Sequence, residues 1–150
     1  METIKIGLLG CGTVGSGVAE LLTKNADIIS LKTGAKLEIK KILIRDVGKK
    51  RIESLPQEVF TTNPVDILED PEIQIVAELM GGIEPAKSYI LKALANGKNV
   101  VTANKDIIAS HGEELFKLAE EKEKDLLFEG SVAGGIPIIH PLSQCLAANE

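Results

Sequence analysis

Short apolar runs alternate with amphipathic stretches along most of the chain. The runs at residues 4–9 and 73–79 have the length of strands, and the second is almost entirely apolar, as in a strand covered on both faces. The stretches between such runs repeat apolar residues at helical spacing, as a helix with one buried face does. This alternation predicts parallel strands joined by right-handed helical crossovers.

The ends of the predicted elements follow from capping and breaking residues. Asn63 and Pro64 are typical of a helix start, Gly34 and Gly97 of a helix end, and S-x-x-E at residues 110–113 of a capping box. We expect strands at residues 4–9, 37–44, 59–61, 73–79, 99–102 and 126–129. We expect helices at residues 13–24 with an extension toward residue 31, briefly after Asn63, at residues 84–96, and from Ser110 to a charged run at residues 120–125.

The predicted fold class is α/β, a Rossmann-type, doubly wound parallel sheet forming a single domain. We assign residues 1–135 to this dinucleotide-binding domain and residues 136–150 to the start of a helix leading to a further domain. Ligands of such sheets bind at the carboxyl ends of the strands. Candidate chemistry is therefore sought in the loops there, at residues 10–15, 45–51, 80–82, 102–106 and 129–135.

Three glycines follow the first strand at the spacing G-x-G-x-x-G, namely Gly10, Gly12 and Gly15. In a dinucleotide-binding turn the first permits the sharp turn, the second lets the backbone approach a pyrophosphate, and the third lets the helix pack against the strand. The helix start then presents free N–H groups to the phosphates. The pattern alone is also compatible with a structural turn, but its place between an apolar strand and a helix favours a dinucleotide site.

The residues after the second strand bear on the choice of cofactor. An acidic residue there binds the ribose hydroxyl of NAD, whereas an arginine suits the 2′-phosphate of NADP. Here Arg45 precedes Asp46, and a basic run follows at residues 49–51. Arg45 and the basic run favour NADP, while Asp46 leaves NAD open; a solvated turn is the alternative for the basic run.

Two further charged residues stand at strand ends. Lys105 follows the fifth strand, where a lysine could contact the cofactor or transfer a proton near the substrate, or could be an ordinary salt-bridged surface residue. Glu129 precedes a glycine-rich turn, where its carboxylate and backbone carbonyls could hold a cation, or where it simply caps the turn. His111 and His140 are assigned no metal role.

Composition narrows the function classes. The chain has 150 residues, 44% hydrophobic and 26% charged, as is ordinary for a soluble globular domain, and its net charge of −5 argues against a nucleic-acid partner. Cys11 and Cys145 lack metal-ligand spacing and fit the reduced thiols of a cytosolic protein. With no export signal and no run of membrane-spanning length, we expect a cytoplasmic protein without a membrane partner.

Several of these motifs together resemble the N-terminal half of homoserine dehydrogenase. The matching pieces are G-C-G-T-V-G-S-G at residues 10–17, Arg45-Asp46, E-L-M-G-G at 78–82, V-T-A-N-K at 101–105 and E-G-S-V-A-G-G-I-P at 129–137. The first piece is common to many nucleotide-binding folds, whereas the last two are much more specific. The pieces stand in the family's order across nearly the whole chain.

The resemblance implies an NAD- or NADP-dependent interconversion of L-homoserine and L-aspartate 4-semialdehyde, a step toward threonine and methionine. It implies that Thr13, Val14 and Arg45 contact the cofactor. It implies that Gly81, Thr102 and Lys105 line the nicotinamide end, with Lys105 assisting proton transfer between nicotinamide and substrate. It also implies a sodium site formed by the Glu129 carboxylate and the backbone carbonyls of Val132, Gly134 and Ile136.

The chain is shorter than members of this family, which continue into a substrate-binding and dimerising domain. We therefore expect a truncated piece that binds the dinucleotide with little or no turnover of homoserine, and a homodimer only for the full-length protein. The apolar residues between 136 and 146 are expected to promote self-association of such a piece.

Three other interpretations remain open at this point. The chain could belong to another small-substrate dehydrogenase, such as an aspartate or dihydrodipicolinate-type reductase, against which the motifs at residues 102–105 and 129–137 argue. It could be a regulatory domain that senses NAD(P) and controls a partner. It could also be a purely structural sheet domain, which would bind no dinucleotide.

Overall fold

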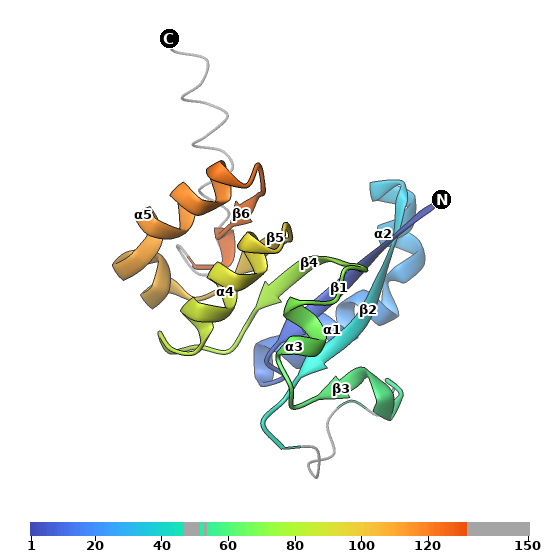
Figure 1. Cartoon of the computed structure of the whole chain (residues 1–150). Coiled ribbons are helices and arrows are strands. Elements are labelled where there is room, and N and C mark those ends of the chain that lie inside the picture. Colours follow the sequence, from blue (N-terminus) through green and yellow to red (C-terminus); the bar gives the residue numbers. More distant parts are fainter. Residues whose placement is uncertain (47–51, 53, 132–150) are drawn as a thin grey trace.

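The structure is a computed structural model that describes residues 1–46, 52 and 54–131. Within these residues six parallel strands form one sheet in the order β3-β2-β1-β4-β5-β6 (Figure 1). The strands are β1 (Glu2–Leu9), β2 (Ala35–Leu43), β3 (Phe60–Thr61), β4 (Ile73–Glu78), β5 (Asn99–Thr102) and β6 (Leu126–Leu127). The sequence order reverses between β1 and β4, which places the switch point of the sheet beside the glycine-rich turn. The predicted fold class is confirmed.

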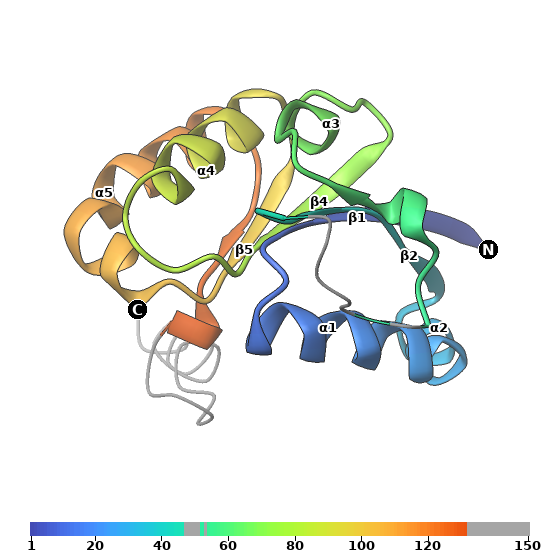
Figure 2. The ribbon, with the colours of Figure 1, turned by 90° about the horizontal axis from the view of Figure 1, so that it is seen from below.

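Helices cover both faces of the sheet (Figure 2). They are α1 (Thr13–Lys24), α2 (Ala26–Thr33), α3 (Val65–Leu68), α4 (Ala86–Ala95) and α5 (Lys105–Glu121), with short 3-10 turns η1 (Gln57–Val59) and η2 (Glu129–Ser131). Helices α1 and α2 lie on one face, and α3, α4 and α5 lie on the other. This two-sided cover explains the nearly continuous apolar sequence of β4.

Successive residues of the central strands enter different cores. Leu8 and Ile42 belong to the core on the α1 side, whereas their neighbours Leu9 and Leu43 belong to the core under α3, α4 and α5. This is the two-residue alternation of a strand whose faces are both buried. All four side chains are almost completely buried. Because this burial holds the last residues of β1 and β2 in place, the positions of the loops that follow these strands are fixed as well.

Helix α5 begins five residues earlier than the sequence predicted. The capping box expected at Ser110 is wrong, because the helix starts at Lys105 and Asn104 is its N-cap, with Oδ1 accepting the Ile107 N–H at 3.3 Å. The Ser110 hydroxyl instead donates to the Asp106 carbonyl within the helix. A buried asparagine two residues after β5 thus outweighs a capping pattern at exposed positions.

Other boundaries differ less. The first helix ends at Lys24, and α2 continues after Asn25 as a separate helix that stops at Gly34, whose φ of 73° is left-handed. The strand predicted at residues 126–129 is shorter, because Glu129 already belongs to η2. The expected cap Asn63 does accept the Val65 N–H, at 3.2 Å, although the helix is bounded by Pro64.

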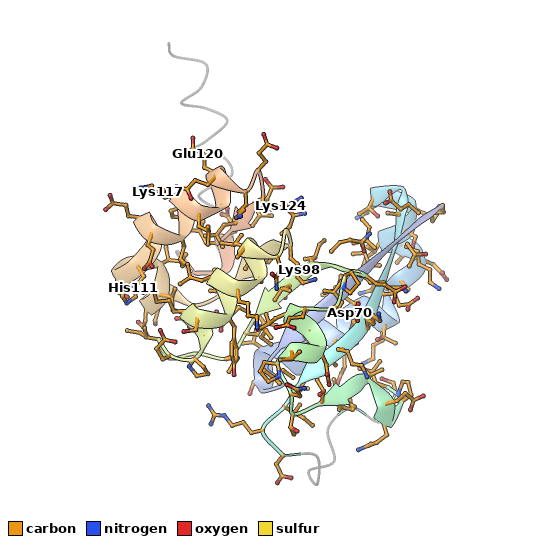
Figure 3. All side chains as sticks on the ribbon, in the orientation of Figure 1. Asp70, Lys98, His111, Lys117, Glu120 and Lys124 are labelled. Atoms are coloured by element: carbon orange, nitrogen blue, oxygen red, sulfur yellow. The ribbon has the colours of Figure 1, made fainter. Side chains whose placement is uncertain are left out.

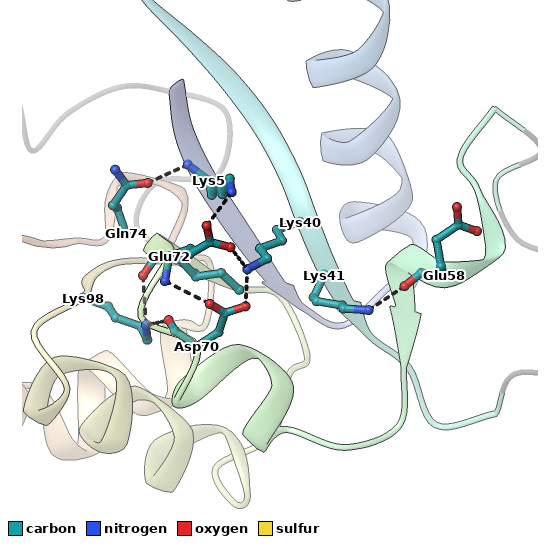
Figure 4. Close-up of polar contacts among 9 residues, drawn as sticks. Lys5, Lys40, Lys41, Glu58, Asp70, Glu72, Gln74 and Lys98 are labelled. Atoms are coloured by element: carbon teal, nitrogen blue, oxygen red, sulfur yellow. Dashed lines mark hydrogen bonds and ion pairs between the residues drawn. The ribbon is translucent and has the colours of Figure 1, made fainter. Parts of the chain in front are cut away.

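A cluster of lysines and carboxylates surrounds the start of β4 (Figure 4). It consists of Lys5, Lys40, Asp70, Glu72 and Lys98, and we call it the lysine–carboxylate cluster. Lys40 Nζ pairs with Asp70 at 2.6 Å and also with Glu72, and Lys5 Nζ pairs with Glu72 at 3.0 Å. Lys98, only 3% exposed, donates to the backbone carbonyls of Asp70 and Ile73. The cluster joins strands β1 and β2 to the turn between α3 and β4 and to the turn between α4 and β5.

These contacts shift the proton affinities within the lysine–carboxylate cluster. Hydrogen bonds from Lys40 and Lys5 lower the pKa of Glu72. Burial opposes ionisation of Asp70, but hydrogen bonds from Lys40 and the Glu72 backbone N–H outweigh it and lower that pKa too. Hydrogen bonds to Asp70 and Glu72 raise the pKa of Lys40, while burial lowers that of Lys98.

Some predictions fall on residues outside the described part of the chain. They are the basic run at residues 49–51, His140, Cys145, the cation-site residues Val132, Gly134 and Ile136, and the helix start at residues 136–150. The division of the chain at residue 135 stays a prediction for the same reason. None of the helices formed by the described residues is long and apolar enough to cross a lipid bilayer.

Candidate dinucleotide-binding site

A pocket of about 590 Å³ opens at the carboxyl ends of β1, β2 and β4, which is a volume typical of small-molecule sites. Its walls come from the loops predicted to carry the chemistry, together with the start of α4. It is lined by Gly10, Cys11, Gly12, Leu43, Ile44, Arg45, Asp46, Thr62, Leu79, Met80, Pro85 and Tyr89. The glycine-rich turn and the end of β2 therefore meet at one site, as the sequence predicted.

The glycine-rich turn has the geometry that its spacing suggests. Gly10 has a φ of 104°, which side chains rarely tolerate, and a Cβ at Gly15 would stand 2.3 Å from the Gly10 carbonyl oxygen. Gly15 thus permits α1 to touch the preceding turn. A Cβ at Gly12 would meet no atom of the described residues within 4 Å. These residues do not require a glycine at position 12, so a ligand approaching the backbone there accounts for it best.

The start of α1 is open toward a ligand. Gly12 is its N-cap and offers no side chain, and no acidic residue occupies the first turn. Among the described residues, no side chain accepts from the first-turn N–H groups, and no acidic residue of the helix itself offsets the positive end of its dipole. Thr13 and Val14 are exposed beside this end, although neither lines the pocket. The arrangement suits a pyrophosphate.

The end of β2 contributes the charged rim of the pocket. Arg45 and Asp46 are both exposed and both line it, and Thr62 joins them from the end of β3. Arg45 makes no ion pair with any residue that the structure describes. Its guanidinium is therefore available for an anionic group such as a phosphate.

The opposite wall is built from Leu79, Met80, Pro85 and Tyr89. Tyr89, the only tyrosine in the chain, was not predicted as a site residue. It lies one turn inside α4, where its sequence spacing indicates only an amphipathic helix, and it lines the pocket because α4 packs beside β4. Thr62, which follows β3, was missed as well, whereas Cys11 lies within the predicted glycine-rich turn but was given no role there.

Three residues predicted for the nicotinamide end stand beside the pocket rather than in its wall. Gly81 belongs to the loop after β4, Thr102 ends β5, and Lys105 begins α5. Thr102 is buried, and its hydroxyl donates to Glu78 at 2.7 Å. Lys105 is exposed and forms no ion pair with the described residues, which argues against the salt-bridged surface lysine.

The predicted cation site is described only at Glu129, which is partly buried in η2. Across the described residues no group of three or more His, Cys, Asp or Glu side chains could hold a metal ion. His111 lies on α5 (Figure 3) and does not line the pocket.

Comparison with known proteins decides the family. The sequence profile described as "Homoserine dehydrogenase, NAD binding domain" matches residues 10–129. The chain belongs to the homoserine dehydrogenase family. The matched residues include the whole pocket wall and the predicted nicotinamide end, so they constitute the NAD(P)-binding domain of that family. This assignment excludes the aspartate and dihydrodipicolinate-type reductases considered above.

Homoserine dehydrogenases of several bacteria are close relatives. The enzyme of Bacillus subtilis is 46% identical over 150 residues, and that of Synechocystis is 48% identical over 148 residues. The alignments cover 100% and 99% of this chain but only 35% and 34% of the relatives. The chain thus spans about a third of the length of these homoserine dehydrogenases.

Solved structures of the family share the fold. The crystal structure of a homoserine dehydrogenase from Thiobacillus denitrificans superposes with a TM-score of 0.89 at 46% identity, covering 99% of this chain and 34% of that one. A hyperthermophilic archaeal homoserine dehydrogenase in complex with NADPH superposes with a TM-score of 0.75 at 28% identity, covering 93% of this chain and 48% of that one.

Proposed function

We propose that this chain is the cofactor-binding part of an enzyme that interconverts L-homoserine and L-aspartate 4-semialdehyde by hydride transfer. The observation that carries the proposal is the pocket at the switch point of the sheet, where the open start of α1 faces an arginine at the end of β2. Both features suit a phosphorylated dinucleotide. The family assignment supplies the reaction.

The chain's own residues would hold the cofactor at two ends. The turn at Gly10, Gly12 and Gly15 and the backbone N–H groups of Thr13 and Val14 would receive the pyrophosphate, and Arg45 would pair with a 2′-phosphate. Gly81, Thr102 and Lys105 would border the nicotinamide, which accepts or donates the hydride when bound. Lys105 would then be the group that assists proton transfer to or from the substrate oxygen.

We propose NADP as the preferred cofactor. Arg45 is exposed in the pocket without an ion-pair partner among the described residues, and a relative has been solved with NADPH. Asp46, next along the pocket, would be the corresponding contact for NAD. The two residues stand side by side, so affinity measurements must decide between them.

Calorimetric titration with NADPH and NADH tests this assignment. Arg45→Ala should weaken NADPH binding by about 1.5–3 kcal/mol, because a charge-assisted hydrogen bond to a phosphate is lost. NADH binding should stay within about twofold. Equal losses for both cofactors would refute the role of Arg45, and no saturable binding of either by the unaltered protein would refute the proposed function itself.

We expect the 150-residue chain to bind cofactor but to turn over little or no homoserine. It spans about a third of its relatives, and Lys105 does not line the described pocket. A spectrophotometric assay of NADPH formation and consumption tests this expectation. Turnover by the purified chain, free of full-length enzyme, would contradict it. A dinucleotide sensor would show no turnover even within a longer protein.

Three further assignments accompany the proposal. The sodium site of Glu129, Val132, Gly134 and Ile136 rests on the family resemblance. A homodimer is proposed for the full-length protein only. A cytoplasmic location is proposed on the family resemblance alone.

A further inference from the structure

Glu78 is a buried acid that the proposed function leaves without a task. It is the last residue of β4 and is 0% exposed. One carboxylate oxygen accepts the Met80 backbone N–H at 2.8 Å, and the other accepts the Thr102 hydroxyl at 2.7 Å. Because Glu78 and Thr102 are paired in neighbouring strands, a single carboxylate fastens the ends of β4 and β5 together.

The contacts continue beyond Thr102 and return to the loop after β4. The Thr102 oxygen accepts the Asn104 backbone N–H at 3.0 Å, and the Asn104 amide donates to the Gly82 carbonyl at 2.6 Å. The two loops are thus joined at both ends, through Glu78 on one side and Asn104 on the other. We call this ring of contacts the Glu78–Asn104 ring.

Asn104 also fixes the start of α5. Its side-chain oxygen accepts the Ile107 N–H at 3.3 Å, while its side-chain nitrogen holds Gly82. Lys105 is the next residue and the first of the helix. The direction in which Lys105 leaves the backbone is therefore set by the same residue that anchors the loop after β4.

The loop that the ring anchors forms one wall of the pocket. Met80, whose N–H is held by Glu78, lines the pocket together with Leu79. Gly81 and Gly82 both have left-handed backbone, with φ of 77° and 74°. Glycines lose much conformational freedom on folding, so this loop requires specific contacts to keep one geometry.

A buried carboxylate is a costly way to join two strand ends. Removing an acid from water carries a penalty that an apolar residue of similar size avoids, and such replacements are often neutral or stabilising. Fully bonded buried polar groups instead specify one arrangement of the elements that they connect. Here those elements are the pocket wall and the start of the helix that carries Lys105.

We propose that Glu78 and Asn104 are positioning residues for the nicotinamide end of the site. The Glu78–Asn104 ring holds the loop at residues 79–82 and the start of α5 at a fixed separation, so that Lys105 and Gly81 border the nicotinamide ring together. Neither residue lines the pocket, and each acts through the loop that it holds. The inference rests on the proposed function, which gives the nicotinamide its place.

A comparison of two ligands distinguishes a specific effect on the nicotinamide end of the site from a general loss of cofactor binding. NADPH carries the nicotinamide ring, whereas 2′-phospho-ADP-ribose has the same adenine and phosphate groups without it. Glu78→Gln keeps the acceptor for Met80 but offers an N–H₂ group where the Thr102 hydroxyl needs an acceptor. We expect it to weaken NADPH binding by about five- to tenfold, in line with the loss of one hydrogen bond or two. Binding of 2′-phospho-ADP-ribose should change less than twofold.

A second variant covers the case in which Glu78→Gln does not fold. Asn104→Ser retains a good helix cap but loses the hydrogen bond from the side-chain amide to the Gly82 carbonyl. It therefore opens the Glu78–Asn104 ring on the side opposite Glu78. It should reproduce the selective loss of NADPH affinity. The fluorescence of bound NADPH should also shift toward that of the free cofactor in both variants, because the protein encloses the nicotinamide ring less firmly.

A matched carboxylate–threonine pair serves as the control. Asp66 accepts the Thr61 hydroxyl at 2.6 Å at the end of β3, far along the sheet from β5. Asp66→Asn should not change the ratio of the two affinities. Equal losses for both ligands in Glu78→Gln and Asn104→Ser, or no loss in either, would overturn the positioning role. Failure of the unaltered protein to bind NADPH would instead overturn the proposed function.

Discussion

At the start of β4, basic side chains are bonded to carboxylates and carbonyls, whereas at the pocket edge of the sheet two basic side chains form no ion pair with the described residues. Lys40 and Lys5 pair with carboxylates in the lysine–carboxylate cluster, and Lys98 donates to two backbone carbonyls. Beyond the end of β4, Arg45 and Lys105 make no ion pair with the described residues. Charges that satisfy one another contribute to stability, and charges that do not are free to bind a ligand.

The difference between the two edges of the sheet predicts which substitutions change the stability of the fold and which change cofactor affinity. A change at the start of β4 should alter unfolding without altering cofactor affinity. A change at the pocket should do the reverse. Exceptions are expected where a residue of the glycine-rich turn also has a packing role, and Gly15 is the clearest of these.

The largest effects are expected in the glycine-rich turn. Gly12→Ala adds a Cβ that meets no described atom within 4 Å, so the free energy of unfolding should change little, by about the 1 kcal/mol or less of a weaker helix cap. NADPH affinity should nevertheless fall at least about 100-fold, because the methyl group occupies the position of the pyrophosphate. Calorimetry and thermal melts measure both quantities.

Gly15→Ala provides the contrast. Its Cβ would stand 2.3 Å from the Gly10 carbonyl oxygen, so both stability and affinity should decline. If Gly12→Ala destabilised the protein as strongly as Gly15→Ala, the interpretation of Gly12 as a ligand-contacting position would be wrong.

An intermediate effect is expected at Lys98. Lys98→Met leaves two buried carbonyl groups, those of Asp70 and Ile73, without their donor, which should cost about 2 kcal/mol of unfolding free energy. NADPH affinity should not change. Urea denaturation combined with titration tests both statements. Lys92→Met is the matched control, since Lys92 forms an exposed pair with Glu69 and should cost below about 0.5 kcal/mol. A loss of NADPH affinity in Lys98→Met would contradict the independence of the lysine–carboxylate cluster from the pocket.

The smallest effect on stability is expected from lowering the pH. The pKa values of Asp70 and Glu72 are lowered from reference values of 3.8 and 4.5, so their contribution to stability is fully present above those values. It is lost as the pH falls through the lower folded-state values, because protonation removes the contacts with Lys40 and Lys5. Thermal melts from pH 6 down to about pH 3 should therefore show a declining midpoint.

Glu72→Gln should flatten that decline. Glu113→Gln should not, since Glu113 is exposed and forms no ion pair with the described residues. An unchanged acid dependence in Glu72→Gln would show that the lysine–carboxylate cluster does not respond to pH as its contacts imply.

Local sequence patterns were enough to predict the sheet and its ligand-binding edge. Apolar runs such as β4 and the spacing of Gly10, Gly12 and Gly15 depend on neighbouring residues alone, and they correctly predicted the strands and the turn. Arg45 was found because the end of β2 has a fixed place beside that turn.

What depends on contacts between distant residues was missed. The start of α5 was misjudged because Asn104 gains its capping role from a buried position beside Gly82, 22 residues earlier, whereas Ser110 has only a local pattern. Tyr89 lines the pocket because α4 packs against β4, and nothing in its neighbours along the chain indicates this. The ring through Glu78 likewise requires the pairing of β4 with β5.

Strand β1 precedes the other described strands along the chain, yet it lies in the interior of the sheet between β2 and β4. During synthesis its glycine-rich turn is therefore made well before Leu79 to Tyr89, the residues that complete the pocket. The turn acquires its second wall when β4 inserts beside β1. The pocket proposed for the cofactor is thus complete only once the sheet has closed around β1.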